Sequence, residues 1–287
     1  MVFARRPRAG GRLGRRMPPP PTCCIDGFVK LTILGTGTSF GVPQIACGCA
    51  VCHSTDPHDK RTRCGAIIET DDGTRLLIDT PPELRLQLIA ADVQSIDAVL
   101  YTHEHADHIH GIDDLRAFTM RSSVALPLYG SAETLATLSA RFPYIVDSSM
   151  RPLPGTTKPE GVPIEVTPGV PFRVRNTDVM PIAVPHGRTE VLAFRVGPIA
   201  YVTDAKSIPD SAIAALAGVR VLVLNALMHK VHPTHLSISE AIAVARRIGA
   251  EQTLLTHLTH ESFHADLVAE LPAGIGPAYD GLVVEVH

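Results

Sequence analysis

The sequence predicts an α/β protein in which two mixed β-sheets pack face to face and are flanked by helices. Apolar segments of strand length occur in two groups along the chain, and helical segments follow each group. No internal repeat at a fixed short period is present. With 287 residues, of which 45% are hydrophobic, the chain is long enough to bury one large core.

The first group of predicted strands covers residues 31–34, 67–70, 75–78 and 98–101. Asp71-Asp72-Gly73 lies between the second and third of these and is a hairpin signal. Glycines after a strand, as in the segment 35–39, can cradle a phosphate, but the spacing is not that of a Walker loop and no lysine follows. A tight turn is therefore favoured there, and residues 111–120 predict a helix.

The second group of predicted strands comprises several short segments within residues 162–203 and an apolar segment at 219–224. A capping box, Ser237-Ile238-Ser239-Glu240, then predicts the start of a helix that runs through Ile248. Gly249 is placed to end it.

A cluster of metal-binding residue types follows the apolar segment 98–101. The motif His103-Glu104-His105-Ala106-Asp107-His108 places three imidazoles and a carboxylate within six residues. Such a set at the end of a strand suits a borderline divalent metal such as zinc. The spacing indicates two ions, because His103 and His105 can converge on one side of the loop while Asp107 and His108 point to the other.

With the preceding threonine, this motif (T-H-x-H-x-D-H) resembles the signature of the metallo-β-lactamase fold superfamily. The resemblance spans residues 31 to about 260 and implies an αββα sandwich with one or two metals at the sheet ends. It also implies that His186, Asp204 and His257, each after its own apolar strand, complete the ligand set. Asp79, at the end of the strand 75–78, is implied to sit behind the ligands and to orient them.

A second cluster consists of thiols. Cys47, Cys49 and Cys52 fall within six residues, and His260 lies three residues after His257. Three thiolates and one imidazole form a closed tetrahedral zinc set, the usual composition of a structural site.

This arrangement is similar to that of the phosphoribosyl 1,2-cyclic phosphate phosphodiesterases, the PhnP-like family. Members carry the thiols in an N-terminal insertion, here about residues 42–64, and the fourth ligand in a T-H-x-x-H pair. Two alternatives stay open: His53 as the fourth ligand, and a set of free buried thiols. A disulfide framework is disfavoured, because six cysteines in 287 residues are few and no secretion signal accompanies them.

The resemblance implies a phosphodiesterase with two divalent ions, zinc or manganese, in the active site. Two ions about 3.5–4 Å apart can share a bridging hydroxide that attacks phosphorus, with Asp204 bridging from the other side. His235, just before the capped helix, resembles the family's active-site histidine outside the metal shells and is predicted to donate a proton or bind a phosphoryl oxygen. A surface histidine is the alternative. We expect a small cyclic phosphate or nucleotide-like phosphodiester as substrate.

Other functions fit the sequence less well. A tRNA 3′-end endonuclease of the same superfamily would share the ligands but needs a long basic arm, which we do not find in residues 17–287. There, 20 basic residues (26 minus the six arginines of the first 16 residues) face 29 acidic ones, and the resulting charge of −9 opposes a nucleic-acid partner. A thiol-ester hydrolase or lactamase is disfavoured by the paired carboxylates Asp107 and Asp204. The complete ligand set argues against a non-catalytic nucleotide-binding module.

Residues 1–24 are predicted to be a basic, disordered extension, and residues 25–287 one hydrolase domain. A start codon placed too early, with Met17 as the true start, or a nucleic-acid-binding arm would explain the same segment. No apolar run approaches the roughly 18 residues of a membrane span, so we expect a cytoplasmic enzyme without a membrane partner. The resemblance implies a homodimer.

Overall fold

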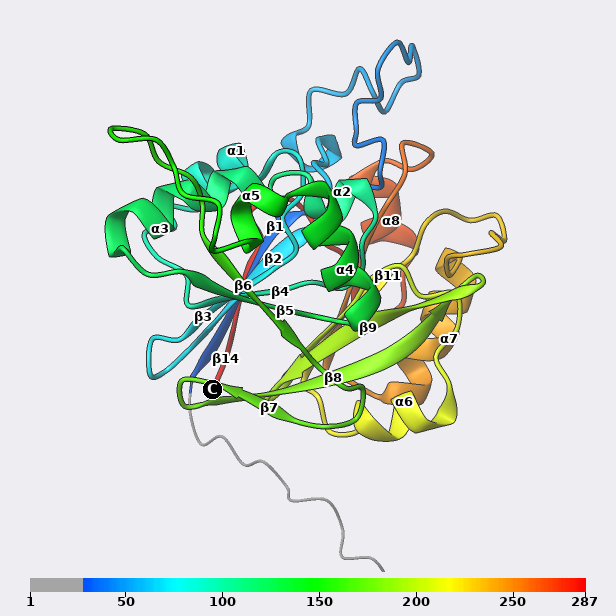
Figure 1. Ribbon diagram of the computed structural model, residues 1–287. Helices are drawn as coiled ribbons and strands as arrows, with labels where there is room; N and C mark the ends of the chain where they lie inside the picture. The colour runs from blue at the N-terminus through cyan, green and yellow to red at the C-terminus, as the bar shows by residue number, and fades with distance from the viewer. Residues whose placement is uncertain (1–27) are drawn as a thin grey trace, which may run out of the picture.

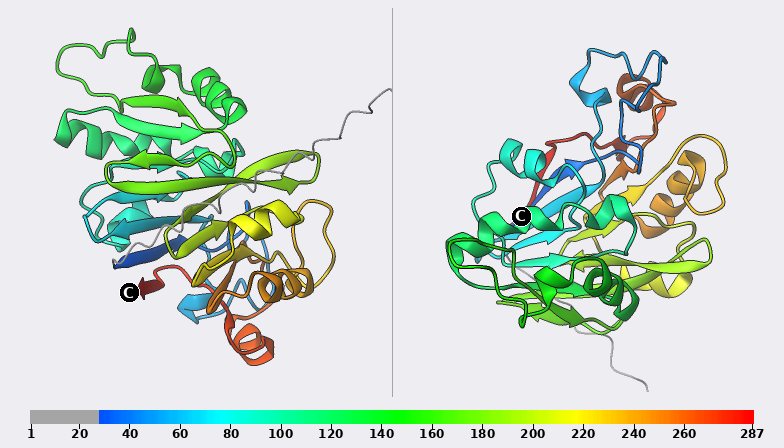
Figure 2. Two further views of the ribbon diagram at one scale, coloured as in Figure 1. Left: turned by 90° about the horizontal axis from the view of Figure 1, so that it is seen from below. Right: turned by 45° about the horizontal axis from the view of Figure 1, so that its top comes forward.

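The computed structural model describes residues 28–287, and the expected extension 1–24 lies outside the described residues. Two seven-stranded sheets lie face to face with helices on their outer sides (Figure 1). The view from below shows the same layers in succession (Figure 2). The fold class predicted from the sequence is confirmed.

The first sheet has the order β14-β1-β2-β3-β4-β5-β6. Strands β3 to β6 are parallel to one another, whereas β14, β1, β2 and β3 pair antiparallel. The carboxyl ends of β3 and β4 therefore meet at one edge. The strands are β1 (Val29–Gly35), β2 (Gly65–Thr70), β3 (Arg75–Ile78), β4 (Ala98–Leu100), β5 (Leu126–Gly130), β6 (Gly161–Glu165) and β14 (Val283–Val286).

The second sheet has the order β13-β12-β11-β10-β9-β8-β7. Strands β10 to β13 are parallel, and the antiparallel pairs β10·β9 and β9·β8 give β8 the same direction as β10. The carboxyl ends of β8, β10 and β12 thus lie at one edge. The strands are β7 (Phe172–Val174), β8 (Thr177–His186), β9 (Thr189–Val196), β10 (Ile199–Val202), β11 (Val221–Asn225), β12 (Gln252–Thr256) and β13 (Ile275–Pro277).

The core has three layers. Side chains from both sheets, such as Leu31 and Phe194, pack between them. A second cluster joins the first sheet to its helices, and a third joins the second sheet to the remaining helices. The helices over the first sheet are α1 (Leu84–Ala90), α3 (Arg116–Ser122), α4 (Ala132–Arg141) and α5 (Pro143–Val146), and those over the second are α6 (Asp210–Ala215), α7 (Ile238–Ile248) and α8 (His264–Glu270).

Local signals in the sequence produce the expected structures in most places. The capping box of α7 is formed in full, and Gly249 ends this helix with φ = 73°. Gly73 has φ = 77° in the turn of the β2–β3 hairpin. No helix within residues 28–287 has the length and apolar character needed to cross a bilayer.

The single helix predicted for residues 111–120 was wrong in detail. The segment after β4 is divided into α2 (Ala106–Ile109), the 3-10 turn η2 (Ile112–Leu115) and α3. Gly111 separates α2 from η2, because its N–H donates to the carbonyl of Thr80 rather than to the preceding helical turn. A Cβ at this position would lie 2.0 Å from the carbonyl oxygen of Pro81, so only glycine permits this close contact.

The cysteine insertion lies between β1 and β2 and contains a 3-10 turn, η1 (Pro57–Asp59). Its two ends are held together by close backbone packing. A Cβ on Gly35 would lie 2.0 Å from the carbonyl oxygen of Arg63, and one on Gly37 would lie 2.5 Å from that of Arg61. These two glycines allow two chain segments to approach closely. The turn predicted for residues 35–39 lies slightly later, where the Gly41 amide donates to the Thr38 carbonyl.

Candidate metal centre

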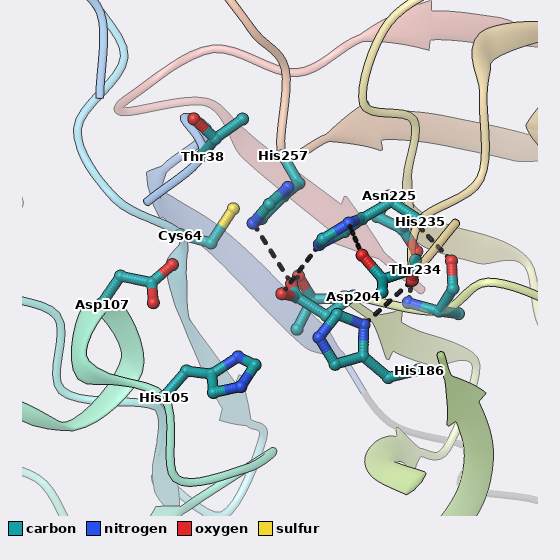
Figure 3. Close-up of polar contacts among 12 residues, drawn as sticks. Thr38, Cys64, His105, Asp107, His186, Asp204, Asn225, Thr234, His235 and His257 are labelled. Atoms are coloured by element: carbon teal, nitrogen blue, oxygen red, sulfur yellow. Dashed lines mark hydrogen bonds and ion pairs between the residues drawn. The ribbon is translucent and has the colours of Figure 1, made fainter. Parts of the chain in front are cut away.

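The strand ends bring the predicted ligands together. His186 is the last residue of β8, Asp204 follows β10, and His257 directly follows β12 in the second sheet. The segment 103–108 follows β4 in the first sheet. In Figure 3, Asp204 lies among His186, His235 and His257, with His105 and Asp107 on the opposite side.

Three residues at this edge have an unusual backbone conformation. Asp79, Asp204 and His257 have φ values of 61°, 58° and 59°. The left-handed region is uncommon for residues other than glycine, and each such residue costs about 1–3 kcal/mol that the surrounding structure must offset. Strain of this kind is concentrated at functional sites. Here all three residues follow the carboxyl ends of strands, β3, β10 and β12, that meet at the candidate centre.

The potential ligand atoms form two adjoining groups. In the first, ligand atoms of His103, His105, His186 and Asp204 lie within 4.8 Å of one another. His103 Nε2 and His105 Nδ1 are 2.9 Å apart. Asp204 Oδ2 lies 3.7 Å from His103 Nε2.

The second group consists of Asp107, His108 and His257. Asp204 reaches this group as well: its Oδ1 lies 3.4 Å from His257 Nε2, and its Oδ2 lies 3.7 Å from His108 Nε2. Asp107 Oδ2 lies 3.4 Å from His108 Nε2. Asp204 therefore stands between two groups whose membership matches the two sides predicted from the sequence.

A hydrogen-bond chain behind the ligands fixes their orientation. The buried carboxylate of Asp79 accepts from His108 Nδ1 at 2.7 Å, from the Thr102 amide at 2.8 Å and from Thr102 Oγ1 at 2.8 Å. Thr102 Oγ1 in turn lies 3.0 Å from His103 Nδ1. His186 Nδ1 donates to the carbonyl oxygen of Thr234 at 2.9 Å. Since these contacts use Nδ1, the Nε2 atoms of His103, His108 and His186 are directed into the site.

The residues fit a cation. His108 Nε2 and both ring nitrogens of His257 are buried and have no hydrogen-bond partner. Buried polar atoms without a partner are rare and costly, whereas an imidazole nitrogen is a good ligand for a divalent metal. The donor set of imidazoles and carboxylates suits zinc or manganese.

The charges of the site are strongly perturbed when no cation balances them. Burial lowers the pKa of His257 to about 4. Burial would also lower the pKa of His108, but Asp204, Asp79 and Asp107 raise it well above its usual value. Burial would raise the pKa of Asp204, but His257 and His108 hold it well below its usual range. Asp204 is therefore ionised at neutral pH and available as a ligand.

His235 lies beside this centre. Its Nε2 is 3.2 Å from Asp204 Oδ2, and its Nδ1 is 2.8 Å from Thr234 Oγ1. The ring lies against the His/Asp centre and not on the outer surface, since only 13% of the side chain is exposed. His235 also forms a third group of potential ligand atoms with Asp204 and His257. The geometry accommodates either a ligand or a residue that acts on the substrate.

The thiols predicted to hold a structural zinc are also brought together. His260 Nδ1 lies 3.3 Å from Cys47 Sγ, 3.3 Å from Cys49 Sγ and 3.6 Å from Cys52 Sγ. A backbone hydrogen bond from Cys52 lowers the pKa of Cys49 to about 6, whereas burial raises that of Cys52 to about 11. His53, the alternative fourth ligand, is exposed and contacts the carbonyl of Cys49 instead.

Three neighbours of these sites were not found from the sequence. Asn225 Oδ1 accepts from the Ala205 amide at 2.8 Å and its Nδ2 donates to the Ala205 carbonyl at 3.0 Å, which holds the residue after Asp204. Cys64 is buried against Thr256, 3.4 Å from its Oγ1. Arg61 is buried beneath the segment 257–264. Single polar residues in apolar surroundings give no periodic or motif signal, so only their contacts reveal them.

Comparison with known proteins gives the same fold. The family model of the beta-lactamase superfamily domain matches residues 74–258. Together with the two groups of ligand atoms, this match defines a metal-dependent hydrolase with the metallo-β-lactamase fold. A solved structure described as a new diphosphatase from the PhnP family is 38% identical, with a TM-score of 0.82, and the match covers 90% of this chain and 97% of that one. The chain belongs to the beta-lactamase superfamily and, within it, to the PhnP family.

Two curated relatives have other names. An octanoyltransferase of Porphyromonas gingivalis is 40% identical over 256 residues, which cover 88% of this chain. This chain spans only about half of that protein, 51% of its length. A ribonuclease Z of Mycobacterium sp. (strain KMS) is 27% identical over 262 residues, which cover 80% of this chain and 84% of the relative.

Proposed function

We propose that this protein is a two-ion phosphodiesterase that hydrolyses a small cyclic phosphate or a nucleotide-like phosphodiester. The carrying observation is that Asp204, a member of the first group of ligand atoms, also lies 3.4 Å from His257 Nε2 and 3.7 Å from His108 Nε2 of the second. A carboxylate between two cation sites suits in-line displacement at phosphorus, where charge on the attacking and the leaving oxygen must be balanced together. The likeness to a PhnP-family diphosphatase supports chemistry at phosphorus.

In this proposal, His103, His105 and His186 hold one ion, Asp107, His108 and His257 hold the other, and Asp204 contacts both. When bound, two such ions acidify water at the site and neutralise charge on the phosphoryl oxygens. Asp79 holds the His108 ring and, through Thr102, the His103 ring. The Thr234 carbonyl does the same for His186. These contacts keep the ligands in place before a substrate arrives.

His235 is proposed to act on the substrate. Its position beside Asp204 puts its ring at the edge of the centre, and Thr234 Oγ1 contacts Nδ1. A neutral ring could hold a phosphoryl oxygen through an N–H, and a protonated ring could supply the proton that a leaving alkoxide requires.

The thiol cluster is proposed to hold a structural zinc. Three sulfur atoms and one imidazole nitrogen converge, and no carboxylate or open position is part of the group. Such a closed set supports folding and does not take part in hydrolysis.

A ribonuclease Z activity is the second candidate, because relatives with that name align over most of the chain. Against it stands the charge of residues 17–287, where 20 basic residues (26 minus six) face 29 acidic ones. Binding of a polyanion relies on many phosphate contacts from lysine and arginine. We therefore favour a small substrate.

A hydrolysis screen tests the proposal. Protein loaded with zinc or with manganese is assayed against cyclic phosphodiesters, linear diesters, a nucleoside diphosphate, precursor tRNA and a β-lactam. We expect turnover of one or more small diesters and none of the β-lactam. Activity on precursor tRNA alone would replace the proposal with the second candidate, and activity on the diphosphate alone would restrict the chemistry to anhydrides. Inactivity of fully loaded protein on every phosphorus substrate would overturn it.

A further inference from the structure

Arg61 is the largest of the fully buried side chains and is not accounted for by the proposed chemistry. It lies in the cysteine insertion, with 1% of the residue exposed. A buried arginine is expensive unless its charge is paired and its N–H groups find acceptors. The identity of these acceptors therefore indicates why an arginine stands there.

The guanidinium binds the segment that carries one ligand of each candidate site. Arg61 Nη1 donates to the carbonyl oxygen of Thr259, and Nη2 donates to that of Ser262 at 2.9 Å. Thr259 stands between His257, a member of the His/Asp centre, and His260, a member of the thiol cluster. One rigid, planar guanidinium donates to both carbonyl oxygens. The single ammonium group of a lysine could not reproduce this fixed geometry.

A carboxylate also contacts the guanidinium, whose buried Nε has no hydrogen-bond partner. Asp59 Oδ1 lies 3.5 Å from Arg61 Nη2 and accepts from the His264 amide at 2.7 Å, while its Oδ2 accepts from Ser54 Oγ at 2.6 Å. Asp59 and Arg61 together thus join the insertion to the whole segment from Thr259 to the start of α8. The backbone amides on either side, those of Leu258 and Thr259, are held by the carbonyls of Thr36 and Leu227.

His257 needs such support. Its φ of 59° is strained, and neither of its ring nitrogens has a hydrogen-bond partner that would fix the ring. His108, His103 and His186 are each oriented by a contact at Nδ1, whereas His257 has none. The position of His257 is therefore set by its backbone, and Arg61 helps to hold the backbone of this segment, together with the carbonyls of Thr36 and Leu227.

We propose that Arg61 is a positioning residue of the His/Asp centre, which holds His257 in place by binding the segment that also carries His260. The insertion would then do more than stabilise the fold: it would set the affinity of the neighbouring centre for its ions. This inference rests on the two cation sites of the proposed function but not on the substrate. It applies equally to any hydrolase that uses these ligands.

The test compares four proteins: the wild type, Arg61→Met, Arg61→Lys and the matched control Arg63→Met. Arg63 lies two positions away and contacts Glu83 and the Ser39 carbonyl, not the segment 257–264. Metal-free protein is titrated with cobalt(II) against a chromophoric chelator. The thiolate-to-cobalt absorption reports the thiol cluster, and the remaining uptake reports the His/Asp centre. No substrate is present.

We expect Arg61→Met to bind cobalt at the His/Asp centre about 10–100-fold more weakly, the usual effect of losing a residue that orients a ligand. The loss at the thiol cluster should be smaller, because its three cysteines lie in the insertion and not in the segment that Arg61 binds. Arg61→Lys should fall in between, and Arg63→Met should match the wild type. If Arg61→Met does not fold, the intermediate affinity of Arg61→Lys is the deciding measurement.

Two results would overturn the inference alone: wild-type affinity at the His/Asp centre in the folded Arg61 variants, or an equal loss at both sites, which would indicate a general structural role. A wild-type protein that takes up cobalt only at its thiols would overturn both this inference and the two-ion centre. If the hydrolysis screen fails while these cobalt affinities are as expected, only the proposed substrate class is wrong, and the role of Arg61 stands.

Discussion

The two candidate metal sites meet in one short segment, at His257 and His260, but they are built in opposite ways. The His/Asp centre draws its residues from the ends of β8, β10 and β12 in one sheet and from the loop after β4 in the other. The thiol cluster takes three of its four residues from a single insertion. The first site depends on the whole fold, and the second depends on one segment and one histidine.

The two sites also differ in burial and in how many of their ligand atoms already have partners. His108 and His257 are 0% and 2% exposed and keep ring nitrogens without partners, whereas Cys47, Cys49 and His260 are only half-buried and their ligand atoms already meet one another. A centre that binds a substrate must keep unused coordination, which requires a rigid scaffold behind it. A structural site can close upon itself. A site's dependence on the fold therefore follows from the coordination positions that it must leave open.

The largest expected effect is at the His/Asp centre. Asp107→Ala and His186→Ala each remove a ligand from a different group, so each should reduce diester hydrolysis by several orders of magnitude, to the level of protein stripped of metal. Turnover and circular dichroism of each variant provide the measurement. Asp113→Ala, at an exposed carboxylate paired with Arg116, is the matched control and should keep its activity. Substantial turnover by either folded ligand variant would speak against a mechanism with two ions.

A smaller effect is expected at His235, which separates chemistry from metal binding. His235→Ala should keep its metal content and lose about 10²–10⁴-fold in turnover of an alkyl diester, the typical contribution of general acid–base catalysis. A nitrophenyl diester, whose leaving group needs little protonation, should be affected much less.

His229→Ala serves as the control for His235, because His229 is exposed and paired with Glu270. An equal loss on both esters would assign His235 to phosphate binding. A reduced metal content would make it a ligand, and unchanged rates would remove it from the mechanism.

The thiol cluster should respond in stability and metal content rather than in chemistry. Cys49→Ser should lower the metal content from about three ions per chain to two and reduce the melting temperature, since a structural zinc contributes roughly 10–16 kcal/mol of apparent binding free energy in small peptides. Elemental analysis and thermal melting are the measurements. Cys24→Ser, at a thiol outside the cluster and before the described part of the chain, should keep all three ions. Unaltered zinc content and melting of Cys49→Ser would show that the thiols hold no structural ion.

The smallest effect is expected far from both sites. Deletion of residues 1–24, which precede the described part of the chain, should leave kcat/KM on small diesters unchanged, because the first strand starts at Val29. A large loss on a small substrate would show that this segment contributes to the enzyme. A loss confined to RNA substrates would support a nucleic-acid-binding arm.

Much of the molecule followed from local patterns. Strand-length apolar segments, the hairpin at Gly73 and the capping box of α7 are set by neighbouring residues, and the structure has them where the sequence placed them. The segment 103–108 was recognisable because six consecutive residues carry its donors. His186, Asp204 and His257 were found through their places after strands and through a family resemblance.

Other features could not be found in this way. Gly111 separates α2 from η2 because of a contact with Thr80 and Pro81, about thirty positions earlier. Arg61 meets Thr259 across 198 positions of sequence, and Asn225 meets Ala205 across 20. Neither Arg61 nor Asn225 belongs to a motif, so the sequence does not distinguish either of them from other polar residues.

The sequence by itself determined the residue types of both sites and the order in which strands present them, because donor chemistry and strand periodicity are local properties of the chain. Only the tertiary structure decided that Asp204 stands between two groups of ligands, that His260 and not His53 meets the thiols, and that Arg61 holds the segment linking the sites. These facts depend on distances between segments far apart in the chain. Such distances are fixed when the two sheets pack together, because burial of their shared core sets where every strand ends.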